Sequence, residues 1–216
     1  MLFNLVETEK INSNVYSIKN QGVNFYLFQE GSDIIAIDTG NNNEKTLQEL
    51  KLINIDPKQI KAIFLTHGDY DHTGGINFFS NAKIYVNEAE EQMFQGKKKR
   101  FLLTQMKKLP REYTLIKDNE MITVGNIKIK AISTPGHTPG STSYLINDHT
   151  LFTGDTLRLV KGKVKPFTWW LNLDRKAMRD SIKKLSQLQN IELLATAHTG
   201  YSKDFKGAMS DWIIEN

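Results

Sequence analysis

Cysteine is absent from the 216-residue sequence. Its absence excludes a thiolate nucleophile, a disulfide framework, and zinc or iron–sulfur sites that use cysteine ligands. A metal ion bound by this chain must therefore take nitrogen and oxygen ligands. Histidine is also scarce, with five residues in the whole chain, so the position of each one is informative.

Long apolar runs are missing as well. No stretch of the sequence approaches the roughly 18 apolar residues that a membrane-spanning helix needs. The first ten residues carry two acidic side chains and no apolar segment behind a basic start, which argues against a secretory signal. We therefore expect a cytoplasmic protein with no membrane partner.

Charge of one sign is in small excess. Lysine and arginine number 28 against 24 acidic residues, and the resulting net charge of +4 is spread over a chain of mixed charges. The densest basic run, Lys97 to Arg100, is explained most simply as the solvated face of a helix. The alternative is a phosphate-binding rim, which would favour a phosphodiester or nucleic-acid substrate. We do not expect a nucleic-acid partner.

Short apolar runs bounded by turn-forming residues predict strands in most of the chain. The expected strands cover residues 23–29, 34–37, 62–65, 83–86 and 191–196, with hairpins at 121–132 and 142–153. The expected helices cover residues 47–53, 88–109, 174–188 and 203–214. Groups of strands separated by helices predict an α/β domain in which two sheets lie between helices. No break in composition divides the chain, so we expect a single domain over residues 1–216.

The sequence His67-Gly68-Asp69-Tyr70-Asp71-His72 places four potential metal ligands within six residues, directly after an expected buried strand. Ionisable side chains at this density would repel one another unless a cation held them together. The alternative is a solvated loop that happens to be rich in aspartate and histidine.

Three further potential ligands each follow an expected strand. His137 lies in a loop of prolines and glycines at residues 134–141, Asp155 follows the strand that ends near residue 153, and His198 follows the strand 191–196. Loops at the ends of strands on a rigid scaffold are where binding and catalytic sites are usually built. These positions therefore favour the metal site over the solvated loop.

The order of these motifs resembles that of the metallo-β-lactamase-fold superfamily over nearly the whole chain. The matching segments are Asp38-Thr39-Gly40, residues 67–72, residues 135–141, Gly154-Asp155 and His198. The chain looks most similar to the small stand-alone hydrolases of the glyoxalase II-like kind. The resemblance implies an αββα four-layer sandwich with a two-metal site at one edge of the sheets.

The resemblance also implies a ligand for each metal position. The first metal would be held by His67, Asp69 and His137, and the second by Asp71, His72 and His198, with Asp155 bridging them. The implied reaction is hydrolysis by a metal-bridging hydroxide, with Asp71 as the catalytic residue that orients the hydroxide or carries a proton to the leaving group. The expected cofactors are two divalent ions, zinc in the first place.

Asp69 departs from the pattern of the superfamily, in which a second histidine is usual at this position. With histidine, two divalent ions, two carboxylates and a hydroxide would keep one net positive charge, whereas the third aspartate makes the same cluster neutral. We therefore expect a weaker Lewis acid, whose bridging water keeps its proton to a higher pH. The additional oxygen ligand also makes manganese or iron an alternative to zinc.

The function that this resemblance implies is hydrolysis of a small-molecule ester, thioester, lactone or phosphoester bond. One alternative is a redox protein of the di-iron kind that needs a separate electron donor. Others are a metal-dependent phosphodiesterase or nuclease and a metal-binding module without catalysis. Two inserts, residues 88–111 and 160–173, are expected to determine specificity, and we expect a monomer or a homodimer.

Several other residues have both a structural and a functional interpretation. Phe167, Trp169 and Trp170 either line the substrate pocket or pack their insert onto the core. His149 is expected in a solvated hairpin turn, and the hydroxyl of Tyr201 is expected at the surface. Asp38 is expected to support the site through hydrogen bonds to neighbouring backbone and not to bind metal.

Overall fold

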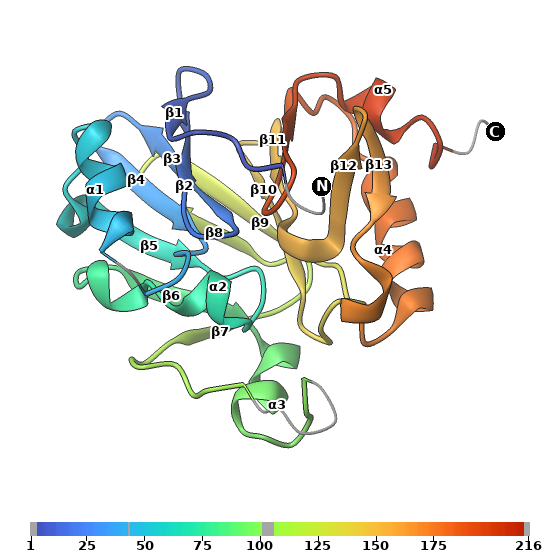
Figure 1. Cartoon of the computed structure of the whole chain (residues 1–216), viewed down its shortest axis with the longest axis horizontal. Helices are drawn as coiled ribbons and strands as arrows, with labels where there is room; N and C mark the ends of the chain where they lie inside the picture. The colour runs from blue at the N-terminus through green and yellow to red at the C-terminus, as the bar shows by residue number, and fades with distance from the viewer. Residues whose placement is uncertain (1–3, 43, 101–105, 214–216) are drawn as a thin grey trace.

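A computed structural model describes residues 4–42, 44–100 and 106–213. Two sheets pack face to face, with helices on both outer sides (Figure 1). The first sheet has the spatial order β1 (Glu9–Lys10), β2 (Val15–Lys19), β3 (Asn24–Glu30), β4 (Asp33–Ile37), β5 (Ile60–Phe64), β6 (Lys83–Asn87) and β7 (Thr114–Ile116). Neighbouring strands are antiparallel from β1 to β4 and parallel from β4 to β7.

The second sheet has the spatial order β15 (Gly200–Ser202), β14 (Leu193–Thr196), β11 (Thr150–Phe152), β10 (Thr142–Ile146), β9 (Ile127–Ser133) and β8 (Met121–Val124). Its strands are antiparallel except for the parallel pair β11 and β14. A separate two-stranded ribbon, β12 (Leu157–Val160) and β13 (Lys163–Pro166), follows β11 in the chain.

The helices are short apart from one. They are α1 (Lys45–Leu52), α2 (Tyr70–Thr73), α3 (Glu91–Phe94), α4 (Arg175–Ser186) and α5 (Phe205–Met209). Helix α4 begins at Asp174, whose carboxylate accepts a hydrogen bond from the Ala177 amide at 2.9 Å,. Its buried residues Met178, Ile182 and Leu185 recur at helical spacing and face the second sheet,.

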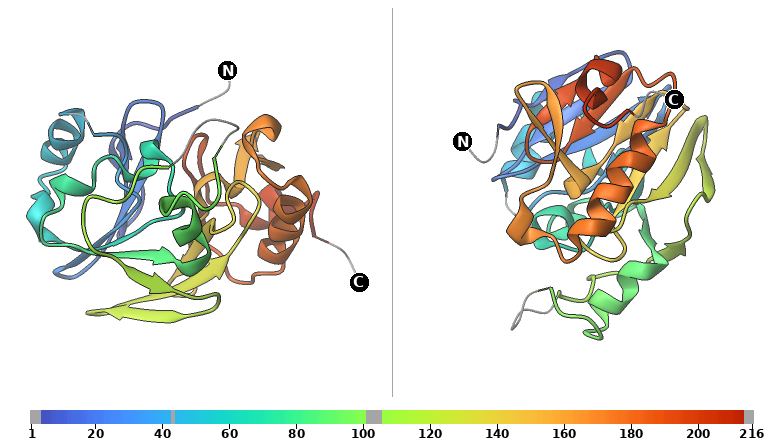
Figure 2. Two further views of the ribbon diagram at one scale, coloured as in Figure 1. Left: turned by 90° about the horizontal axis from the view of Figure 1, so that it is seen from below. Right: turned by 90° about the vertical axis from the view of Figure 1, so that its right-hand side faces the viewer.

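Three apolar clusters separate the four layers. The central cluster lies between the sheets and joins Phe28 and Phe64 of the first sheet to Tyr144 and Phe152 of the second. A second cluster fills the space between the first sheet and α1, and a third packs α4 and α5 on the second sheet. Figure 2 shows the arrangement of these helices and sheets from two further sides. The expected αββα sandwich is therefore confirmed.

The expected helix over residues 88–109 is wrong. A single 3-10 turn at Glu88–Glu90 leads into α3, which ends at Phe94, and Gly96 then takes a left-handed backbone conformation with φ of 70°. Residues 97–100 and 106–109 are not helical, and residues 101–105 lie outside the described part of the chain. The basic run has no apolar stripe that could hold a helix against the core.

Two other differences concern the second half of the chain. The expected insert over residues 160–173 overlaps the β12–β13 ribbon. The first strand of this ribbon begins earlier, at Leu157. The last expected helix, 203–214, is limited to α5 and the turn after it within the described residues. The other expected strands and helices are present with shifts of a few residues at their ends, and β1, β2, β7 and β15 are additional.

Four strands end at the edge of the sandwich where the sequence places its ligand loops. Segments with His67, His137, Asp155 and His198 follow β5, β9, β11 and β14, respectively. Loops from both sheets therefore meet at this edge. In the parts of the chain that the structure describes, no helix combines the length and the apolar character required to cross a bilayer.

Candidate metal centre

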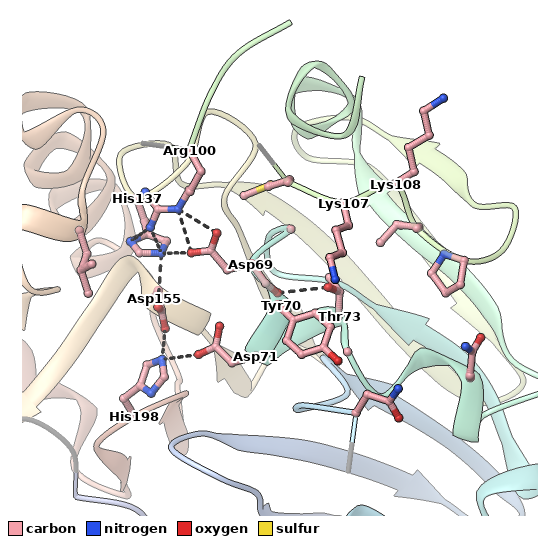
Figure 3. A pocket seen from close by; sticks show the side chains of 18 of the residues that line it. Asp69, Tyr70, Asp71, Thr73, Arg100, Lys107, Lys108, His137, Asp155 and His198 are labelled. Carbon is pink, nitrogen blue, oxygen red and sulfur yellow. Dashed lines mark hydrogen bonds and ion pairs between the residues drawn. The ribbon is translucent and has the colours of Figure 1, made fainter. Parts of the chain in front are cut away.

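All seven residues that the sequence singles out as metal ligands lie together at this edge. Figure 3 shows Asp69, Asp71, His137, Asp155 and His198 among them. Four come from the segment after β5, which turns into α2, and three come from loops of the second sheet. The cluster therefore spans the boundary between the two sheets. Its members are His67, Asp69, Asp71, His72, His137, Asp155 and His198.

Three groups of three residues in the cluster have candidate ligand atoms within 4.8 Å of one another: His67, His72 and Asp155, and two further groups that we call the first and the second trio. In the first trio, defined as His67, Asp69 and His137, Asp69 Oδ2 lies 3.4 Å from His67 Nε2 and 3.1 Å from His137 Nε2. The second trio consists of Asp71, His72 and His198. There Asp71 Oδ2 lies 3.7 Å from His72 Nε2 and 3.6 Å from His198 Nε2.

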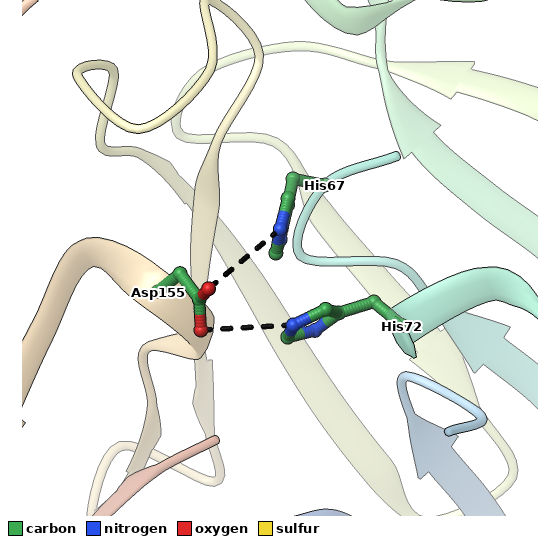
Figure 4. Close-up of side chains that lie close together, drawn as sticks. All are labelled: His67, His72 and Asp155. Carbon is green, nitrogen blue, oxygen red and sulfur yellow. Dashed lines mark ion pairs between the residues drawn. The ribbon is translucent and has the colours of Figure 1, made fainter. Parts of the chain in front are cut away.

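Asp155 lies between the two trios and presents one oxygen to each. Its Oδ2 is 3.4 Å from His137 Nε2 and 4.0 Å from His67 Nε2. Its Oδ1 is 3.1 Å from His198 Nε2 and 3.6 Å from His72 Nε2. Figure 4 shows the carboxylate facing His67 and His72 at once. This is the arrangement that a carboxylate needs in order to bridge two cations.

Asp38 holds the segment after β5 in place. Its carboxylate accepts hydrogen bonds from the Thr66 amide and hydroxyl, both at 2.7 Å, and from His72 Nδ1 at 2.8 Å. The Thr66 hydroxyl in turn lies 3.1 Å from His67 Nδ1. Fixing Nδ1 of each ring aims its Nε2 at the cluster. The supporting role expected for Asp38 is confirmed.

The histidines from the second sheet are fixed in the same way. His198 Nδ1 donates a hydrogen bond to the Gly22 carbonyl at 2.7 Å, and His137 Nδ1 lies 3.2 Å from Asn172 Oδ1. Their Nε2 atoms therefore also point at the carboxylates of the cluster.

The buried ring nitrogens test whether the residues fit a metal ion. His67 Nε2 and His72 Nε2 are fully buried and have no hydrogen-bond partner among the described residues. An unpaired buried polar atom is costly, and such atoms in native proteins call for an explanation. A cation bound by the two trios would satisfy both nitrogens, so the donor set fits an ion that prefers imidazole and carboxylate ligands.

Two carboxylates of the cluster, those of Asp155 and Asp69, are held in their charged form. Burial raises the pKa of Asp155, but the charges of His198 and His72 outweigh it and keep that pKa well below its usual range. Burial also raises the pKa of Asp69, but the nearby His137 and His67 rings outweigh burial and keep that pKa well below its usual range. Ionised carboxylates are the form that binds a cation.

The ring of His72 is shifted in the opposite direction. Burial lowers its pKa, but the charges of Asp38, Asp71 and Asp155 outweigh burial and raise the pKa to about 10. The excess of negative charge thus favours a positive group at this position, which a metal ion would replace.

Arg100 belongs to the site, although the sequence assigned it to a solvated basic run. The side chain is 4% exposed, and its Nε donates to both oxygens of Asp69, at 2.8 and 2.9 Å. Its Nη2 lies 2.8 Å from His137 Nε2. The expected neutral cluster counts the ligands alone, and Arg100 places a further positive charge beside it. The acidic residue at position 69 was the one sequence signal for such a cation.

Glu90 is a second residue that the sequence did not single out. Its buried carboxylate accepts hydrogen bonds from the Gly68 amide at 2.8 Å, the Thr138 hydroxyl at 2.8 Å and the Gly140 amide at 2.9 Å. Burial raises its pKa, and these three donors oppose the shift. Glu90 therefore ties the loop of Asp69 to the loop of His137.

A cavity of about 680 Å³ opens over the cluster. Phe167 is buried in its wall, with its ring 5.2 Å from that of His137 and 5.3 Å from that of His198. Trp169 and Trp170 are more than half exposed and do not line it, so neither of the two roles considered describes them. The remaining wall residues include Asn42, Tyr70, Thr73, Asn77, Met106, Lys107, Lys108, Leu109, Pro110 and Leu171.

The structure keeps His149 and Tyr201 outside the cluster. His149 lies in the turn between β10 and β11, where its Nδ1 is 3.0 Å from the Thr150 hydroxyl. The Tyr201 hydroxyl donates to Glu9 at 3.3 Å, on the exposed side of β15. Both observations agree with the structural interpretation of these residues.

Comparison with known proteins gives the family. The family model described as the metallo-beta-lactamase superfamily matches residues 19–198. The probable polyketide biosynthesis zinc-dependent hydrolase BaeB of Bacillus velezensis is 32% identical over 126 residues, which are 57% of this chain and 49% of that protein. The hydroxyacylglutathione hydrolase of Dictyostelium discoideum is 33% identical over 131 residues, which are 57% of this chain and 42% of that protein. These matches span about half the length of those relatives or less.

The fold has close counterparts among solved structures. A metallo-beta-lactamase family protein of Thermus thermophilus has a TM-score of 0.71 and 20% sequence identity, with 94% of this chain and 79% of that chain covered. Identity at this level shows a common fold alone. Because the family model matches most of the chain, this chain belongs to the metallo-beta-lactamase superfamily.

Proposed function

We propose that this protein is a metal-dependent hydrolase with a two-ion centre, acting on an ester, thioester, lactone or phosphoester bond of a small molecule. The observation that carries the proposal is the grouping of the seven side chains into two trios with Asp155 between them. The names of the two curated relatives, both hydrolases and one zinc-dependent, support the same reaction class.

In this proposal the first trio and Asp155 hold one divalent ion, and the second trio and Asp155 hold the other. Zinc is the preferred ion because imidazole supplies four of the ligands, with manganese or iron as alternatives because three ligands are carboxylates. Bound divalent ions would polarise the oxygen of the scissile bond and lower the pKa of a water molecule.

The protein side chains would position the substrate and move protons. Asp71 is the most exposed carboxylate of the cluster, with 37% of its side chain accessible, and it lines the cavity. We assign it to transfer a proton between the attacking water and the leaving group. Phe167 and Leu171 give the cavity an apolar wall that would exclude water from the acyl or phosphoryl group,.

Two substitutions test the proposal. Asp71→Ala and His72→Ala should each lower turnover by orders of magnitude and leave the far-ultraviolet circular dichroism spectrum unchanged. His149→Ala is the matched control, because His149 lies in a distant turn, and it should keep full turnover. Turnover is measured with chromogenic thioester, lactone and phosphodiester substrates, before and after chelation. Wild-type turnover by both site variants would remove these residues from the mechanism.

Elemental analysis of the purified protein tests the centre itself, where about two transition-metal ions per chain are expected. No bound metal, with no turnover gained from zinc, manganese or iron, would refute the metalloenzyme.

Activity on phosphodiesters alone would favour the phosphodiesterase or nuclease. That alternative rests on the basic run, to whose exposed charge the buried Arg100 does not contribute. Iron with oxygen consumption would favour the redox protein. The cytoplasmic location stays a prediction.

A further inference from the structure

Arg100 is the cationic side chain nearest the first trio. A guanidinium buried to this extent needs partners that replace water, and Asp69 and His137 are two such partners,. Figure 3 shows the guanidinium reaching over both of them from the segment that follows α3. The two partners are members of the same trio, and the contact to His137 uses Nε2.

The two contacts differ in what a metal ion would require of them. The lone pair on His137 Nε2 either accepts a hydrogen bond from Arg100 or binds a cation, so the 2.8 Å contact and a bound ion exclude each other,. Asp69 has two oxygens. It can keep Oδ1 on the Arg100 Nε and turn Oδ2, which faces both histidines of the trio, toward an ion.

The second trio is built differently. Asp71 Oδ2 faces both of its histidines, and their Nδ1 atoms are held by Asp38 and by the Gly22 carbonyl. The Nε2 atoms of His72 and His198 face carboxylate oxygens, which an ion can join without displacing a cationic side chain.

We propose that Arg100 sets the order in which the two metal positions fill, because its guanidinium occupies His137 Nε2 and must withdraw before the first trio binds an ion. The second trio fills first, and the first trio binds more weakly. This inference rests on the proposed metal centre. A hydrogen bond to a charged group contributes enough to separate the two dissociation constants by roughly 10- to 100-fold.

The test is calorimetric titration of the metal-free, full-length protein with zinc, supported by the visible spectrum during titration with cobalt. The wild type should bind one ion tightly and a second ion roughly 10- to 100-fold more weakly. Arg100→Met keeps the length of the side chain and removes its donors and charge. It should tighten the second event so that both ions bind in one step. Lys98→Met, in the exposed part of the same basic run, is the matched control and should leave two separate events.

Arg100→Lys keeps the charge but lacks the planar guanidinium. The ratio of its two dissociation constants should lie between those of Arg100→Met and the wild type, which distinguishes the effect of the hydrogen bond from that of the charge. Thermal melts of the metal-free variants establish that each is folded. Equal binding of two ions by the wild type, or an Arg100→Met titration that keeps or widens the separation, would overturn the inference and leave the metal centre intact. Failure of the wild type to bind any ion would refute the centre itself.

Discussion

Glu90 gives the sharpest test of how the ligand loops are held. Its carboxylate accepts three hydrogen bonds, from the Gly68 and Gly140 amides and from the Thr138 hydroxyl. In Glu90→Ala the Thr138 hydroxyl keeps Ser141 Oγ, at 2.9 Å, as a partner. The two amides are left buried without one.

A buried unpaired donor costs about 1–3 kcal/mol, so Glu90→Ala should lower the free energy of unfolding by about 2–5 kcal/mol. For a chain of this size, that corresponds to a fall in Tm on the order of 10 °C. In Glu90→Gln the amide carbonyl replaces one carboxylate oxygen and still accepts hydrogen bonds, but the amide NH₂ faces one of the donors and cannot accept from it. The loss of unfolding free energy should therefore be smaller, about 1–3 kcal/mol.

The assay is thermal and urea unfolding of the metal-free protein, with Glu88→Ala as the control. Glu88 belongs to the same 3-10 turn and is exposed, so its removal should leave the Tm close to that of the wild type. Glu90→Ala should also weaken metal binding about 10- to 100-fold, as loss of a residue that orients ligands typically does. A Glu90→Ala protein as stable as Glu88→Ala would refute the reasoning.

Two further predictions concern the scaffold. Gly136 has φ of 145°, and a Cβ there would lie 2.5 Å from Met178 Cα, so Gly136→Ala should lower the unfolding free energy by more than about 1 kcal/mol in urea melts,. Gly162 also has a positive φ but has open space around it, so Gly162→Ala should lower the unfolding free energy by less. Equal losses of unfolding free energy in the two variants would contradict the clash at Gly136. Hydrogen bonds from Lys61 and a backbone amide lower the pKa of Asp33 from 3.8, so the stability it contributes is present above pH 4 and lost below it,. In thermal melts at graded pH, the Tm of Asp33→Asn should therefore decrease less below pH 4 than the Tm of the wild type. An equal decrease would contradict this contribution of Asp33.

The sequence could predict the seven side chains of the cluster because strand ends and polar loops are local features. The loops with His67 and His198 follow apolar runs, and the loop with His137 follows a run in which apolar and polar residues alternate. Both patterns predict strands, and the ends of these strands meet at one edge,. Two sheets between helices could be predicted from the grouping of the strands, and the αββα order was implied by the resemblance to the superfamily. Short strands at the margins, such as β7 and β15, carry too few residues for a period to be recognised.

Arg100 and Glu90 could not be predicted because their partners lie far away in the chain. Arg100 contacts a carboxylate 31 positions earlier, and Glu90 contacts a hydroxyl 48 positions later. Both sit in the segment where a helix was wrongly expected, among other charged residues that do face solvent. Local charge density cannot tell which member of a run will turn inward, since that depends on the charge that tertiary structure brings opposite it.

The location of the cluster across the two sheets would make the proposed metal centre a cross-link between the two halves of the chain. Four of its side chains precede residue 73, and the other three follow residue 136. An ion held by the second trio would close the chain between His72 and His198, which is more than half of the domain, and its binding energy would be added to the contacts between the sheets,. A hundredfold excess over the dissociation constant would contribute about 2.7 kcal/mol. The melting temperature of this protein should therefore report the free metal concentration around it, and chelation should loosen the two halves from each other before either sheet unfolds.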